Sequence, residues 1–173
     1  MQTAIASPSP PLFMQRNSIR LSFRHRAWLF GVFAAAFLTG VAWWVLHRWF
    51  QVAGEFGPSP HPAEHWLIRL HGAAAFATLV LLGSLLPLHV KRAWLAGRNR
   101  RSGGLMLLLN ALLALTGYAL YYAGDESFRA AASSAHLLLG LALPLLLVAH
   151  ILRGRRSRTV VDDAPSPEDE ATD

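Results

Sequence analysis

The sequence predicts an all-α integral membrane protein, an up-and-down bundle of four helices. Of its 173 residues, 53% are hydrophobic and only 15% are charged, whereas soluble globular domains carry about 25% charged residues. The apolar residues gather in four runs, and each run has about the 20 residues that a helix needs to cross a bilayer core of about 30 Å. The four predicted spans are residues 27–47, 66–90, 103–122 and 130–152, which together make a bundle over residues 27–152.

Both ends of the chain are expected to lie outside the bundle. Residues 1–26 hold a Pro-rich run and then arginines, and we predict a flexible basic segment that begins at Met1 or at Met14. The first apolar run is too long for the core of a signal peptide. Residues 153–173 are first basic and then acidic, and we predict a disordered tail because such a composition cannot bury a core.

The Lys and Arg residues predict how the chain is oriented. Four lie in residues 1–26, five in residues 91–102 and four after Leu152, so thirteen of the sixteen fall on one side of the four spans. Because cytoplasmic loops carry the excess of Lys and Arg, we expect a multi-pass protein of the bacterial inner membrane with both termini in the cytoplasm. The aromatic residues support the same span ends. Trp43, Trp44, Trp66 and Tyr122 lie near the predicted outer boundary.

Composition also excludes several function classes. Without Cys the chain has no disulfide, no thiolate zinc or iron–sulfur site and no covalently attached c-type haem. The computed isoelectric point of about 11.0 reflects topology, so we expect no nucleic-acid partner. The spans hold no Gly-rich phosphate loop and no paired carboxylates. Eight histidines in so apolar a chain are therefore the main clue to function.

Four of these histidines occupy matched positions on the second and fourth spans. His71 and His89 are 18 residues apart, and His136 and His150 are 14 apart. At about 100° per residue, each couple lies along one face of its helix. The two spans run in the same direction, so His71 pairs with His136 near the outer surface and His89 with His150 near the inner one. Facing imidazoles between bundle helices are the ligands that b-type haem requires.

The inner pair leaves two interpretations open. The unequal spacings differ by about 6 Å in helical rise. Helix tilt or a kink at Pro87 can take up that difference, and the protein then binds two b haems. Alternatively His89, next to Lys91 and Arg92, is a residue at headgroup level, and only the outer haem is present.

Other residues have predicted supporting roles. Gly72, Gly83 and Gly140 leave room either for a flat macrocycle or for helix packing. Arg69 and Arg129 are candidate partners of haem propionates, or else interfacial anchors. His47 is a reserve ligand of the outer pair or an interfacial cap.

Residues His61 to His65 match the spacing of an inverted zinc-protease motif, His-x-x-Glu-His. Pro62 interrupts the helix that the motif needs, so we predict no protease. A surface metal site, a proton acceptor for quinol at Glu64 or His65, and an ordinary loop remain as interpretations. We further expect His25 to be solvated. The polar residues within the spans should hydrogen-bond to neighbouring helices, namely Asn110, Ser133 and Ser134.

The run from His136 to His150, and Leu115-Thr116-Gly117-Tyr118 before it, resemble a known family. They are similar to prokaryotic di-haem membrane cytochromes b, the b561-like and hydrogenase-type cytochrome b subunits. The resemblance covers roughly residues 66–153. It implies a four-helix bundle, two b haems with bis-His ligation, and electron exchange between quinone and a redox partner.

The leading hypothesis is therefore a membrane cytochrome b that relays electrons between a quinone pool and a dehydrogenase, a hydrogenase or a c-type cytochrome. It would be the electron-transfer subunit of a quinone-linked oxidoreductase, surrounded by membrane lipids. The alternative is a non-redox four-helix scaffold or assembly protein whose histidines are interhelical hydrogen-bond partners. A proton-coupled carrier is the weakest hypothesis, because the predicted spans contain no Asp or Glu.

Overall fold

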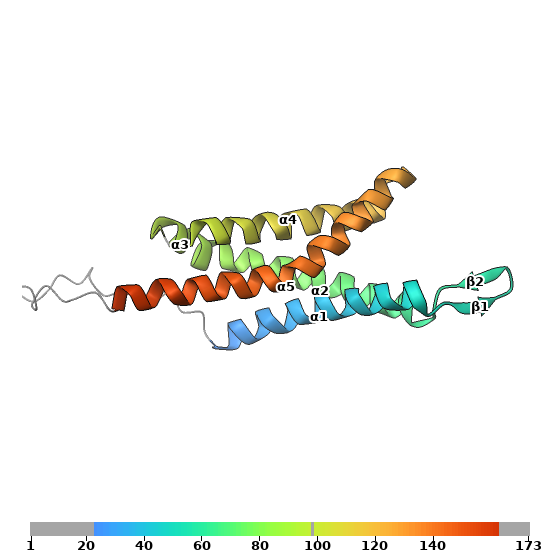
Figure 1. Cartoon of the computed structure of the whole chain (residues 1–173), viewed down its shortest axis with the longest axis horizontal. Coiled ribbons are helices and arrows are strands. Elements are labelled where there is room, and N and C mark those ends of the chain that lie inside the picture. Colours follow the sequence, from blue (N-terminus) through green and yellow to red (C-terminus); the bar gives the residue numbers. More distant parts are fainter. Residues whose placement is uncertain (1–22, 98, 163–173) are drawn as a thin grey trace, which may run out of the picture.

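A computed structural model describes residues 23–97 and 99–162. Long helices dominate it, and a small β-hairpin lies between the first two (Figure 1). The elements in order are α1 (Phe23–Trp49), β1 (Val52–Gly54), β2 (Gly57–Ser59), α2 (Ala63–Leu85), the π-helical turn η2 (Leu86–Val90), α3 (Lys91–Leu95), α4 (Arg100–Tyr122) and α5 (Glu126–Asp162).

The helices form two antiparallel hairpins, α1 with α2 and α4 with α5 (Figure 1). Close backbone packing occurs within each hairpin, whereas the two hairpins approach each other closely at few points. The β-hairpin caps one end of the molecule, and α3 lies at the other end. We refer to these as the β-hairpin end and the α3 end.

The prediction of four apolar helices is confirmed. α1, α2, α4 and most of α5 are each long and apolar enough to cross a membrane. In the part of the chain that the structure describes, only four apolar side chains are buried, those of Phe33, Leu85, Leu109 and Ala132. Large apolar side chains cover the outside instead, such as Leu115, which is 65% exposed. An apolar surface of this kind is stable in contact with lipid, whereas in water it would promote aggregation.

Two helices extend beyond their predicted ends. α1 begins at Phe23, inside the segment 1–26 that we expected to be flexible. α5 continues to Asp162, past residue 152 at which we expected the last span to end. Arg is a good helix former, and the basic run after Leu152 therefore prolongs the helix. Residues 1–22 and 163–173 lie outside the described part of the chain.

The loop after α1 contains a β-hairpin that the sequence did not predict. Val52 pairs with Ser59 and Gly54 with Gly57. Gly57 has a φ of 118°, which side chains rarely tolerate. A Cβ on Gly54 would lie 2.8 Å from the carbonyl oxygen of Gly57. The two glycines allow this turn, and Phe56 at its tip is 96% exposed.

Two prolines change the course of the spans. Pro87 lies in the first turn of η2, where the missing amide opens the helix into a π-turn. This is the predicted site of a kink. The helical path continues through α3, so the predicted loop 91–102 is partly helical. It reverses at Gly97 and Asn99, both with positive φ. Pro144 lies inside α5, which bends near its middle (Figure 1).

Candidate functional site

His71 of α2 and His136 of α5 face each other between the two hairpins. Their ring centroids are 6.0 Å apart, and the ring planes are nearly perpendicular at 83°. The structure thus brings the predicted outer pair together. The two rings also lie at the interface between hairpins whose backbones otherwise approach each other at few points.

Hydrogen bonds from α1 fix the orientation of the His71 ring. Its Nδ1 lies 2.8 Å from the carbonyl oxygen of Ala36. A carbonyl only accepts hydrogen bonds, so Nδ1 carries the proton and donates it. The Thr39 hydroxyl donates to the carbonyl oxygen of Ala35 and lies 3.4 Å from the same Nδ1. When the ring is neutral, its lone pair is therefore on Nε2, where a ligand can use it.

The His136 ring is held in the same way by α4. Its Nδ1 lies 2.9 Å from the hydroxyl oxygen of Thr116. That hydroxyl donates its own proton to the carbonyl oxygen of Leu112, at 2.7 Å, so it accepts from Nδ1 of His136. The Nε2 of His136 is again the nitrogen that carries the lone pair.

A glycine makes room for each of the two rings. A Cβ on Gly40 would lie 2.9 Å from Cε1 of His71, and a Cβ on Gly117 would lie 3.4 Å from Cε1 of His136. The glycines that we predicted for this role lie elsewhere. A Cβ on Gly72 or Gly83 would meet nothing within 4 Å, and one on Gly140 would meet only Leu113.

The two hairpins hold their histidines with the same tripeptide. Leu38-Thr39-Gly40 of α1 faces His71, and Leu115-Thr116-Gly117 of α4 faces His136. Each threonine bonds to the carbonyl groups three and four residues before it. The repeated tripeptide is visible in the sequence, and it is the signal that would have located Thr39 and Gly40.

The second predicted pair lies at the α3 end. Nδ1 of His150 lies 3.0 Å from the hydroxyl oxygen of Ser102, which is buried. His89 lies in η2 at the same end of the molecule. The π-turn that contains His89 takes up one extra residue, which shortens the separation of His89 from His71 by up to about 1.5 Å relative to a straight helix. The mismatch between the two spacings is reduced accordingly.

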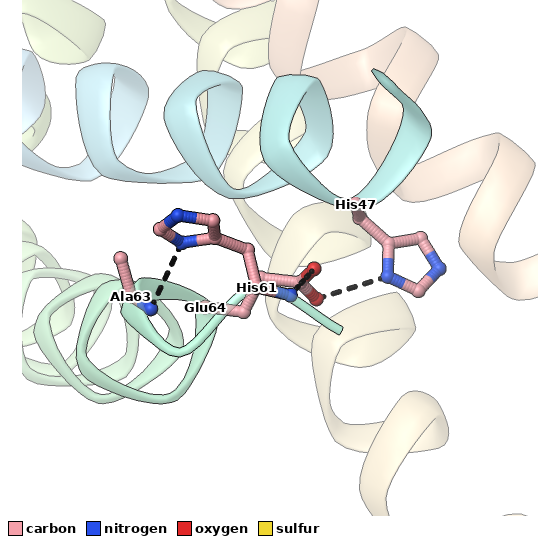
Figure 2. A network of polar contacts seen from close by, with 4 residues as sticks. All are labelled: His47, His61, Ala63 and Glu64. Atoms are coloured by element: carbon pink, nitrogen blue, oxygen red, sulfur yellow. Dashed lines mark hydrogen bonds and ion pairs between the residues drawn. The ribbon is translucent and has the colours of Figure 1, made fainter. Parts of the chain in front are cut away.

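A polar cluster lies at the β-hairpin end (Figure 2). The Glu64 carboxylate is buried, with Oε2 3.0 Å from Nδ1 of His47 and Oε1 accepting the amide of His61 at 3.1 Å. The His47 ring also stacks on Trp43, with centroids 4.8 Å apart. His47, our reserve ligand, is therefore engaged by Glu64. Glu64 precedes His71 by seven residues, which places both on one face of α2.

In residues 23–97 and 99–162, no three His, Asp or Glu side chains are placed to hold a metal ion, at the zinc-protease spacing or elsewhere. Nδ1 of His61 accepts the amide of Ala63 (Figure 2). The His65 ring lies edge-on to Trp66 instead. The two histidines of the motif thus have separate partners.

Arg69 and Arg129 are the predicted partners of haem propionates. Their observed contacts are not with the facing rings of His71 and His136. The Arg69 guanidinium lies over the exposed ring of Trp66, 5.5 Å from its centroid. Arg129 is exposed in the first turn of α5. Within the described ranges, neither arginine forms a hydrogen bond or ion pair with a histidine, and their role stays a prediction.

Three polar residues differ from expectation. Asn110 donates to the carbonyl oxygen of Met106, and Ser134 donates to that of Ala130, both within their own helices. The prediction of interhelical bonds is wrong for these two because a carbonyl one turn back is always within reach. His25, expected to be solvated, is half-buried in the first turn of α1.

No protein-family model, curated protein or solved structure matches this chain.

Proposed function

We propose that the protein is a membrane b-type cytochrome that relays electrons between a quinone pool and a redox partner through bis-His haem. The facing rings of His71 and His136 carry this proposal. Two imidazoles from different hairpins lie close together, and each has its Nδ1 engaged and its Nε2 lone pair available.

The residues present fit such a group. A bond from a metal to an imidazole nitrogen is about 2.0 Å long, so two imidazoles that would hold one metal ion have ring centroids no more than about 6 Å apart. The observed separation is 6.0 Å. The donor set consists of neutral imidazoles in a chain without Cys, which suits haem b and excludes thiolate-bound centres. Gly40 and Gly117 keep side-chain atoms off both rings.

Haem b, when bound, supplies one-electron iron chemistry. The protein's own part is to hold and tune the ligands. The Ala36 carbonyl and the Thr116 hydroxyl accept the Nδ1 protons, which fixes each tautomer and raises the basicity of Nε2. The apolar helices around the rings lower the local dielectric, another lever on a reduction potential. We therefore expect Thr116 and Ala36 to set the potential of the site as well as its geometry.

His89 and His150 are the candidate ligands of a second haem. His150 follows His136 by 14 residues on α5, a rise of about 21 Å, so the two sites would lie near opposite membrane surfaces. Ser102 orients His150 as Thr116 orients His136. The excess of cations at the α3 end favours a cytoplasmic location for that end. We accordingly propose an inner-membrane protein with both termini in the cytoplasm, coupled to a dehydrogenase, a hydrogenase or a c-type cytochrome.

The test is a reduced-minus-oxidised spectrum of the full-length protein, expressed with iron and haem precursor and purified in detergent. We expect the Soret and α bands of b-type haem. His71→Ala and His136→Ala should each remove the same spectral component, whereas His65→Ala, an exposed control, should leave it intact. A wild-type sample without b-type bands would rule out the proposal.

A second candidate function is a non-redox membrane scaffold, and one observation favours it. His71 and His136 already have hydrogen-bond partners on α1 and α4, so both rings link helices without any cofactor. In that case His71→Ala and His136→Ala change only the stability of the protein. The spectra of the wild type and the variants then remain featureless.

A further inference from the structure

A cavity of about 550 Å³ opens at the α3 end of the molecule, where the turn between α3 and α4 meets α5. Ligand sites commonly occupy about 300–1,000 Å³, so the cavity is large enough for a small polar group. Its lining residues are Gly97, Asn99, Arg100, Arg101, Ser102 and Arg153.

Three of the lining residues are arginines, and none is acidic. In residues 23–97 and 99–162 the structure has one ion pair, between His47 and Glu64 at the opposite end. Arg100 is held in place, because its Nε donates to the carbonyl oxygen of Trp94 at 2.8 Å and its guanidinium lies 5.9 Å from the Trp94 ring. Three like charges in one cavity repel each other, so an anion bound there stabilises the local structure.

The surroundings indicate what kind of anion fits. Guanidinium groups bind phosphate through paired hydrogen bonds. The cavity lies at the ends of helices that are long and apolar enough to span a bilayer. Beside it, Trp94 is 50% exposed, and Trp is enriched at the interface between headgroups and acyl chains. Leu95, 74% exposed, adds apolar surface there. We propose that the cavity binds the phosphate group of an anionic phospholipid, with free phosphate as the competing source of the same chemistry.

The cavity also borders the histidine pair of the α3 end. Ser102 lines it and bonds to His150, and Arg153 follows His150 by one helical turn on α5. If the proposed function holds, a bound phosphate adds negative charge beside His150 and should lower the reduction potential of a haem held there. Lipid binding itself needs no haem, so the two proposals are tested by different measurements.

The experiment is native mass spectrometry of the full-length protein in detergent, titrated with phosphatidylglycerol or with phosphatidylcholine. Both lipids carry a phosphate, but only the first has a net charge. We expect phosphatidylglycerol to bind at least tenfold more tightly. A variant with both Arg101→Gln and Arg153→Gln should lose this preference. Arg48→Gln, which removes an exposed arginine at the other end, should retain it.

Further arms separate the sources of phosphate. Arg101→Lys keeps the charge and loses the paired hydrogen bonds, so an intermediate affinity is expected even if the double variant does not fold. Equal binding of both lipids, or wild-type binding by the double variant, overturns the proposal. Displacement of phosphatidylglycerol by millimolar inorganic phosphate means that the cavity recognises free phosphate, which overturns the assignment to a lipid. Loss of lipid on loading with haem means that haem carboxylates occupy the cavity, which overturns it as well.

Discussion

Gly40 of α1 faces the imidazole of His71 of α2 so closely that a Cβ would lie 2.9 Å from Cε1 and 3.0 Å from Nδ1. The absence of a side chain lets the ring approach the α1 backbone, where Nδ1 reaches the carbonyl oxygen of Ala36. The same relationship exists between Gly117 and His136, with more space. In each helix pair, the glycine of one helix therefore allows close packing against the histidine of the other.

Gly40→Ala is expected to displace the His71 ring. Overpacking of this kind costs about 1–3 kcal/mol, and the variant should lose both thermal stability and the spectral component that depends on His71. Gly31→Ala is the matched control, because Gly31 is also in α1 and a Cβ there meets nothing within 4 Å. The control should be neutral or up to about 1 kcal/mol more stable. Equal melting temperatures for the two variants would contradict the close contact.

The long helices and the His71/His136 pair could be predicted from the sequence for a simple reason. A bilayer requires runs of about 20 apolar residues, and the helical period then gives each histidine a depth and a face. Two histidines at the same depth on helices that run in the same direction become candidates for a pair. His71 and His136 satisfied that condition, and their rings lie 6.0 Å apart.

The parts that could not be predicted depend on contacts between helices. Gly40 and Thr39 contact His71 because α1 packs against α2. The apolar pattern of α1 does not indicate which helix packs against it. The small residues that we predicted for this role, Gly72 beside His71 and Gly83 between His71 and His89, face open space instead. The β-hairpin was missed since Glu55-Phe56 is not a common turn pair, and its geometry depends on the glycines at 54 and 57.

Thr116→Val should affect His136 more than Thr39→Val affects His71. The Thr116 hydroxyl lies 2.9 Å from Nδ1 of His136, whereas Thr39 lies 3.4 Å from Nδ1 of His71, which also has the Ala36 carbonyl. Loss of one such hydrogen bond costs about 1 kcal/mol. Redox titration should give a shifted midpoint potential for Thr116→Val and a nearly unchanged one for Thr39→Val. Equal shifts would mean that the two threonines do not differ as ligand partners.

The start of α5 should depend on pH through Asp125. The Ser127 hydroxyl and then the Phe128 amide, both 2.7 Å from Oδ1, hold the pKa of the Asp125 carboxyl below its ordinary value of 3.8. A lowered folded-state pKa means that the cap stabilises α5 above about pH 4 and is lost as the pH falls through the lowered pKa. Hydrogen exchange at Phe128 and Arg129, corrected for the intrinsic effect of pH, should be severalfold faster at pH 2 than at pH 6.

Two variants test that dependence. Asp125→Asn keeps an oxygen that accepts both hydrogen bonds, so it should protect the first turn of α5 equally at both pH values. Asp125→Ala removes the acceptor and should expose the turn at every pH. A wild-type protein whose corrected exchange does not change with pH would show that the carboxylate does not cap α5.

The Glu64 carboxylate should stabilise the β-hairpin end mainly through its bond to the His61 amide. Glu64 is 6% exposed, and Glu64→Ala leaves that amide without its acceptor, which costs about 1–3 kcal/mol. Glu64→Gln keeps one oxygen and should cost less.

The bond between Glu64 and His47 should contribute less to stability because the His47 side chain is 52% exposed. A double-mutant cycle with His47→Ala should therefore give a coupling of about 0.2–1 kcal/mol. Unfolding in a graded detergent mixture gives all these values. His65→Ala, an exposed neighbour of Glu64, is the control and should not couple. A coupling of several kcal/mol would mean that the His47 ring is shielded from solvent in the membrane, whereas no difference between Glu64→Ala and the wild type would exclude a structural role for the carboxylate.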